Sequence, residues 1–172
     1  MAQQDSKSEF DAFVRAQQKN AQPDVDWKKE RDDWLAYLDS LYKEITTLLG
    51  EYIQSDQVLV RYHDVLLNEE GIGQYKARRL IIKIGGKEIV LEPIGTLLVG
   101  TKGRVDVTGP AGKTRFMLVD KDAIRPSFRV ATTSSQKGPQ WIWKIVTSPP
   151  NIQYIELTRD SLFRALMEVS GG

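Results

Sequence analysis

The apolar residues of this chain change their spacing near residue 57, from a helical period to a strand period. Over residues 27–53 they recur every three or four positions, which places them on one broad face of a helix. From Gln57 onward apolar and polar residues alternate, which is the pattern of a half-buried strand. Because each pattern buries its apolar residues in only one kind of backbone, the sequence predicts an α+β fold with helices first and strands afterwards.

Two N-terminal helices and one C-terminal helix are predicted. Ser6 and Glu9 fit a capping box, so a short first helix is expected over residues 7–20. A long amphipathic helix is expected over residues 27–53, with Asp26 as its N-cap and Gly50 weakening its last turn. Thr158 is the expected cap of the closing helix.

Short, glycine-rich connections separate the predicted strands. Gly85-Gly86 is typical of a two-residue hairpin turn, and segment 109–112 predicts another turn. Connections this short permit only antiparallel pairing. Segment 92–95 is expected to interrupt a strand, whereas a strand is expected at 128–133. The prediction is a strongly curved or partly closed antiparallel meander of seven or eight strands over residues 57–172, with the helical segment 1–56 packed on it or extending from it.

Charge is distributed unevenly along the chain, although the net charge is only +1. Residues 1–56 contain seven basic and twelve acidic residues, a net charge of −5, whereas residues 57–172 carry a net charge of +6. Segment 76–137 alone contains thirteen basic and five acidic residues. The sequence therefore predicts an acidic helical part beside a basic sheet.

Composition makes several classes of site improbable. The 172 residues include no cysteine and one histidine, so disulfides, thiolate chemistry and transition-metal sites are not expected. The polar N-terminus indicates no secretory signal, and the apolar runs are too short to span a membrane. A cytoplasmic protein without membrane contact and without a cofactor is therefore expected.

Two motifs resemble functional sites but lack a required part. Segment 109–114 ends like a phosphate-binding loop, yet Val107 occupies the place of the first glycine and a strand is expected after it. That segment is therefore predicted to be a hairpin turn. His63 has Asp64 beside it in sequence, but neighbouring strand residues point to opposite faces, so the pair does not form a catalytic arrangement by itself.

Three groups of residues are candidate binding surfaces. The apolar stripe of the long helix could bind a protein partner or a second copy of the chain: Trp34, Tyr37, Leu38, Leu41 and Ile45. A basic set could contact an anion or a nucleic acid: Arg78, Arg79, Arg104, Arg129 and Lys144. Trp141 and Trp143 could form an aromatic platform for stacking, although burial in the core explains them more simply because both faces of that strand are largely apolar.

The expected function is a non-catalytic binding or protein-interaction module. A nucleic-acid or anion-binding module is an alternative, which is not favoured because the isoelectric point of 7.9 lies below the value of about 9 typical of such domains. A hydrolase or lyase that relies on carboxylates alone is a second alternative, because some glycosidases use only paired acids.

Overall fold

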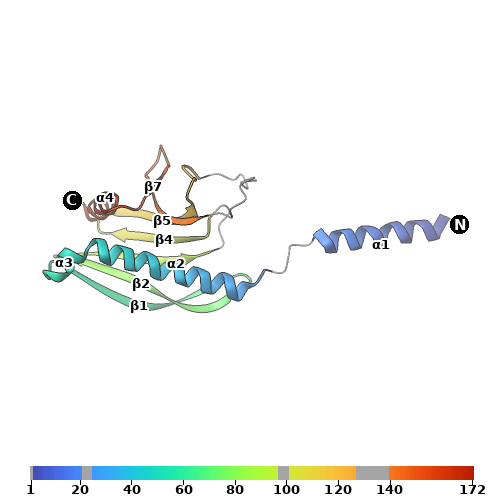
Figure 1. Ribbon diagram of the computed structural model, residues 1–172, viewed down its shortest axis with the longest axis horizontal. Helices are drawn as coiled ribbons and strands as arrows, with labels where there is room; N and C mark the ends of the chain where they lie inside the picture. Colours follow the sequence, from blue (N-terminus) through green and yellow to red (C-terminus); the bar gives the residue numbers. More distant parts are fainter. Residues whose placement is uncertain (1, 21–24, 97–100, 127–139) are drawn as a thin grey trace.

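The computed structural model describes residues 2–20, 25–96, 101–126 and 140–172, and gives the backbone alone for residues 2–5 and 18–20 (Figure 1). Within these residues the chain forms four helices and one seven-stranded antiparallel sheet that does not close into a barrel. The helices are α1 (Ala2–Asn20), α2 (Trp27–Leu48), α3 (Gly50–Gln54) and α4 (Arg159–Ser170). The strands are β1 (Val58–Glu69), β2 (Gly73–Ile84), β3 (Lys87–Gly95), β4 (Gly103–Gly109), β5 (Gly112–Asp120), β6 (Trp141–Val146) and β7 (Tyr154–Glu156). The predicted α+β class is confirmed.

The helix ends follow local chemistry in most places. The Asp26 carboxylate accepts a hydrogen bond from the Lys29 N–H at 3.0 Å, which confirms the predicted cap of α2. Thr158 caps α4 through a reciprocal pair of hydrogen bonds with Ser161. The single helix predicted over residues 27–53 is divided, because α2 ends at Leu48 and α3 begins at Gly50. The predicted start of α1 was wrong, since the helix already begins at Ala2 and Ser6 lies inside it.

The strands follow one another in space in the order of the sequence, β1 to β7. β2 ends at Ile84 and β3 begins at Lys87, so the turn predicted at Gly85-Gly86 is confirmed, with Gly85 at a φ of 58°. The turn predicted at segment 109–112 also joins two strands, β4 and β5. The strand predicted at 128–133 lies outside the described residues.

One predicted break in the sheet is absent. β3 continues through Pro93 to Gly95, with a register irregularity between these two residues. Pairing of β3 with β2 ends at the Leu80–Leu91 pair, so Pro93 has a paired strand only on its β4 side. A proline without an N–H is tolerated at such an edge position or bulge.

The hairpin of β1 and β2 extends well beyond the part of β2 that pairs with β3. The two strands pair from Val58 and Ile84 at one end to Glu69 and Gly73 at the other, whereas β2 pairs with β3 only over residues 80–84. Val58 and Val60 face the core at the base of the hairpin, but Val65 and Leu67 do so near its tip. The face that meets the core therefore changes along the hairpin, as expected for a strongly twisted two-stranded ribbon.

Helix α2 lies between the β1–β2 hairpin and strands β4 and β5 (Figure 1). Its apolar stripe and the inner face of the sheet share one core, to which α4 contributes Leu162, Leu166 and Val169. The Trp34 ring lies directly over the backbone of Gly103 on β4, where a Cβ atom would come within 2.5 Å of Trp34 Cε3. Glycine at this position allows the helix and the sheet to approach closely.

Helix α1 lies apart from the rest of the molecule in Figure 1. Phe10 and Phe13 are exposed on it, and their ring centroids are 6.2 Å apart.

Candidate interaction surface

The predicted helix interface is occupied by the protein itself. Trp34, Leu38, Leu41 and Ile45 are at most 1% exposed, because the sheet covers them. Tyr37 is half-buried, and its carbonyl oxygen accepts a hydrogen bond from Trp143 Nε1 at 2.9 Å. The apolar stripe of α2 therefore serves the fold, and this arrangement leaves it unavailable to a partner or a second copy.

The arginines of the predicted basic surface face acidic side chains of the same chain. Arg78 pairs with Asp39 on α2 at 3.1 Å and also lies over the Tyr62 ring, 4.6 Å from its centroid. Arg79 approaches Glu92 at 3.6 Å, and the Arg104 guanidinium binds Asp106 through two hydrogen bonds of 2.6 and 2.8 Å. Arg129 lies outside the described residues.

Lys144 is buried on the outer side of β6 and does not face solvent. Its ammonium group donates to the carbonyl oxygens of Lys121 and Ala123, both at 2.7 Å. These bonds hold the segment after β5 against the sheet, and they leave little of the ammonium group available to an external anion.

The two predicted stacking residues, Trp141 and Trp143, face the core side of β6. Trp143 is 7% exposed and packs near Trp34, with ring centroids 6.0 Å apart. Trp141 is half-buried, and Lys102 Nζ lies 5.9 Å from its ring centroid. Core packing therefore accounts for Trp143. Trp141 is covered by Lys102, which also pairs with Glu30 at 2.9 Å.

A carboxylate at the tip of the β1–β2 hairpin is engaged in structural hydrogen bonds. Glu69 accepts from the Tyr75 hydroxyl, and from the backbone N–H and the hydroxyl of Thr96, both at 2.8 Å. Burial and the Glu69 bond raise the pKa of Tyr75 above its usual range. These contacts join the hairpin tip to the end of β3, so they close one end of the space occupied by α2.

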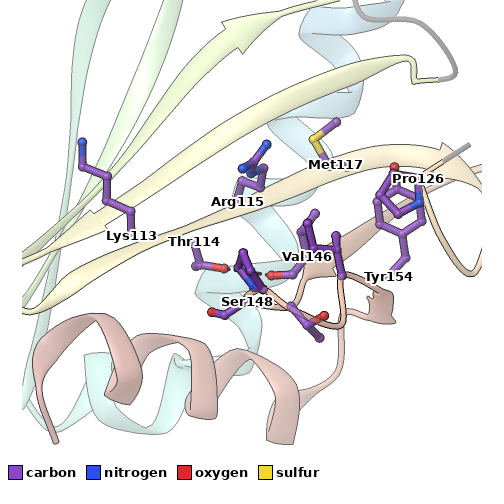
Figure 2. Close-up of a pocket in the computed structure, with 11 residues that line it drawn as sticks. Lys113, Thr114, Arg115, Met117, Pro126, Val146, Ser148 and Tyr154 are labelled. Atoms are coloured by element: carbon purple, nitrogen blue, oxygen red, sulfur yellow. Dashed lines mark hydrogen bonds between the residues drawn. The ribbon is translucent and has the colours of Figure 1, made fainter. Parts of the chain in front are cut away.

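A hollow of about 280 Å³ lies on the outer side of β5, beside the turn that precedes β7 (Figure 2). Lys113 and Arg115 of β5 lie at its rim, and Met117 and Tyr154 line it. Three of its hydroxyl groups have partners in the chain: Thr114 donates to the Val146 carbonyl, Thr147 to the Asn151 carbonyl and Ser148 to Glu168.

Strand β1 offers the longest open edge in the described part of the chain. It is twelve residues long and outermost in the sheet, so no described strand pairs with its outer side. Leu59, Tyr62 and Leu66 are 51%, 40% and 62% exposed. At about 3.4 Å per residue the edge is roughly 40 Å long, and an open edge of this kind can template pairing with another strand.

The backbone edge of β1 is open in its middle, although the Tyr62 ring packs against α2, with its centroid 5.9 Å from that of Tyr42. The Tyr42 hydroxyl on α2 donates to the Arg78 carbonyl oxygen at 2.7 Å, so the edge of β2 faces the helix at this level. β1 lies on the opposite side of β2, where residues 61–64 are all exposed. Twist therefore presents the backbone of β1 outward where the ribbon has only two strands.

The other edge of the sheet is protected. β7 has only three residues, and the Tyr154 N–H donates to the Ile124 carbonyl oxygen at 3.1 Å. A short strand whose amide is already bonded cannot offer a long row of free groups to another chain. The two edges of the sheet thus differ sharply in accessibility.

Sequence reasoning did not identify Leu59, Tyr62 and Leu66 as surface residues. The signal was present for Leu59, which alternates with Val58 and Val60 on the side of Arg61. Leu66 has the same parity as Val58 and Val60, so no single alternation places it at the surface. What the pattern could not supply was the position of β1 at the edge of the sheet.

Among the described residues, no group of three or more His, Cys, Asp or Glu side chains could hold a metal ion. None of the described helices is both long and apolar enough to cross a membrane. Comparison of the chain with protein-family models, curated proteins and solved structures gives no match.

Proposed function

We propose that this chain is a non-catalytic protein-interaction module that binds another polypeptide by adding a strand to β1. The observation that carries the proposal is the twelve-residue open edge with Leu59, Tyr62 and Leu66 exposed along it. In strand addition, backbone hydrogen bonds supply affinity and alternate side chains supply specificity. A suitable partner is an extended segment with apolar residues facing Leu59 and Leu66.

The two alternatives receive less support from the geometry. An anion or nucleic-acid surface needs cations that are available, but Arg78, Arg79 and Arg104 face carboxylates of the chain itself. A carboxylate-based enzyme needs two acids across a pocket, whereas the hollow beside β5 is lined by no acidic residue. Glu69 is committed to Tyr75 and Thr96.

Selection from a library of random twelve-residue peptides displayed on phage tests the proposal. We expect enriched peptides to bind the native chain and to slow hydrogen exchange at the amides of β1. The double variant Leu59→Lys and Leu66→Lys should lose this binding, because it places charges along an apolar edge. Ile155→Lys is the matched control, since Ile155 is 44% exposed on β7 at the protected edge.

Two results would contradict strand addition. One is a selection, made at a concentration at which light scattering shows the chain to be monomeric, in which every enriched peptide protects amides outside β1. The other is a set of peptides that bind the double variant as tightly as they bind Ile155→Lys.

A further inference from the structure

The polarity of residues 58–67, which form most of β1, is nearly symmetric. Residues 58–60 and 65–67 are apolar, whereas residues 61–64 are polar and contain one cation, Arg61, and one anion, Asp64. Neither Arg61 nor Asp64 forms an ion pair with another described residue. Residues 58–67 therefore have a similar chemical character when read in either direction, and Asn68 and Glu69 lie beyond this symmetric part.

We infer that the strand added to β1 is the β1 strand of a second copy of this chain, which makes the protein an antiparallel β1–β1 homodimer. This inference rests on the proposed function, because it names the partner of the same edge. A two-fold axis suits such pairing, since the same surface of both copies meets and the assembly closes at two subunits.

Symmetry restricts the registers in which the two strands can pair. A two-fold axis between antiparallel strands requires one residue to lie opposite the same residue of the second copy. The midpoint of β1 lies between His63 and Asp64, and an axis at Asp64 would place two aspartates opposite each other, so the residue on the axis is His63 or its neighbour Tyr62. Pairing around His63 overlaps residues 58–68, and pairing around Tyr62 overlaps residues 58–66, so on the order of ten backbone hydrogen bonds form in either case.

Both registers place each exposed leucine directly opposite an apolar residue that lies at the edge of the second copy's own core. With Tyr62 on the axis, Leu59 lies opposite Val65 of the second copy and Leu66 lies opposite its Val58. With His63 on the axis, Leu59 lies opposite Leu67 and Leu66 opposite Val60. Directly opposed side chains on one face have Cβ atoms about 4.5–5.5 Å apart, so these pairs are in contact.

The protected β7 edge favours a closed dimer over a chain of subunits. Pairing of β1 with β7 of the next molecule would be head-to-tail and would propagate into a filament. β7 offers three residues, and the Tyr154 N–H is already bonded to Ile124. Only β1 presents a long edge in the described residues, so β1 meets β1.

Cysteine cross-linking tests the symmetry directly, because the chain contains no cysteine. Single variants Tyr62→Cys and His63→Cys should be oxidised under mild conditions, and non-reducing gel electrophoresis should reveal the dimer. We expect the variant on the axis to cross-link at least about tenfold faster than Thr108→Cys, an exposed position on β4 that no β1 register brings near its copy.

The mass in solution gives the second test. Light scattering coupled to gel filtration should give the native chain twice its mass of 19.5 kDa. Leu59→Lys with Leu66→Lys should weaken dimerisation at least about 100-fold. The two copies then contribute four lysines to the interface, and each lysine lies opposite an apolar residue. Ile155→Lys should leave the dimer unchanged, and thermal unfolding of each variant shows whether it is folded.

The outcomes separate this inference from the proposed function. The homodimer is overturned if the native chain stays at 19.5 kDa at millimolar concentration. It is also overturned if a dimer forms equally well in the double lysine variant and cross-links at neither axis position. If displayed peptides still bind β1 in that case, strand addition stands and the partner is another polypeptide. If they do not, both proposals fail.

Discussion

Replacing Gly103 by alanine tests how closely α2 is seated on the sheet. Gly103 is buried in β4, and an added Cβ atom would lie 2.5 Å from Cε3 of Trp34. Carbon atoms in favourable contact are about 3.5–4.0 Å apart, so the ring and the strand would have to separate by roughly 1 Å. Trp34 is fully buried beside Trp143, which leaves its ring little room to move.

The expected effect follows from the cost of overpacking a filled core. Such insertions destabilise by about 1–3 kcal/mol and occasionally more, and a rigid indole places this site at the upper end. For a chain of this size, each kcal/mol lowers the unfolding temperature by about 2–4 °C. We therefore expect Gly103→Ala to lower the free energy of unfolding by about 3 kcal/mol and Tm by about 6–12 °C.

Urea titration and calorimetry measure the change, with Gly112→Ala as the matched control. Gly112 begins β5, the strand paired with β4, and nothing lies within 4 Å of the Cβ position there. Its substitution should change stability by no more than about 1 kcal/mol. The reasoning is refuted if Gly103→Ala and Gly112→Ala unfold within about 0.5 kcal/mol of each other.

A double variant identifies the contact responsible. Cε3 belongs to the six-membered ring of the indole, which Trp34→Leu removes. Gly103→Ala should therefore cost less in the Trp34→Leu background than in the native chain, with a coupling of about 0.5–3 kcal/mol. Strictly additive effects would show that the alanine acts on some other neighbour.

Three further predictions concern stability and titration. Lys144→Met leaves two carbonyl oxygens without a donor, so it should lower the free energy of unfolding by about 1–3 kcal/mol. It should also speed proteolysis after Lys121, and an unchanged cleavage rate would contradict the role of the ammonium group. Burial raises the pKa of Tyr42 and of Tyr75 above the unfolded-state value of about 10. Both protonated hydroxyls therefore contribute their full stability below that pH, and the contribution is lost as pH rises above it. Absorbance at alkaline pH should show these two tyrosines ionising only on unfolding, and Tyr42→Phe should remove one late step. Phe10→Ser with Phe13→Ser should shift the main unfolding transition by under about 0.5 kcal/mol, because both rings are exposed on α1; a larger calorimetric shift would show that α1 packs on the body.

Local signals in the sequence were sufficient for most of the elements. The change of period near residue 57 separates α2 and α3 from the strands, and Gly85-Gly86 marks its turn because glycine accepts the positive φ found there. Asp26 and Thr158 identify helix starts through bonds to residues three positions away. Each of these features depends on neighbours in sequence.

The features that were missed depend on distant partners. In the sequence the alternation that begins at Gln57 places Val58 and Val60 on one face and Leu59 and Arg61 on the other. In the structure the ribbon twists after these residues, and a second set of apolar residues, Val65 and Leu67, then meets the core. No local pattern predicts that a strand changes its buried face while its pairing stays regular.

The structure gives a physical explanation for the contrast between the acidic helices and the basic sheet. Helix α2 covers the apolar face of the sheet, but Arg78 and Lys102 still reach its acidic residues Asp39 and Glu30. On the strands, Arg104 pairs with Asp106 two residues away. These ion pairs compensate part of the charge separation along the sequence, so the paired cations give little reason to invoke an anionic partner.

The two edges of the sheet differ in how well they are protected from pairing with another strand. Soluble proteins usually protect an edge strand with charged side chains, proline, a bulge, short length or a covering segment, and β1 carries charges in its middle, at Arg61 and Asp64. β7 has the last two of these devices, whereas β1 contains no lysine and no proline, pairs regularly along its whole length and exposes Leu59 and Leu66. A chain that protects one edge and leaves a longer, more apolar edge open would aggregate unless that edge had a regular occupant. The chemical symmetry of β1 indicates that this occupant is another β1.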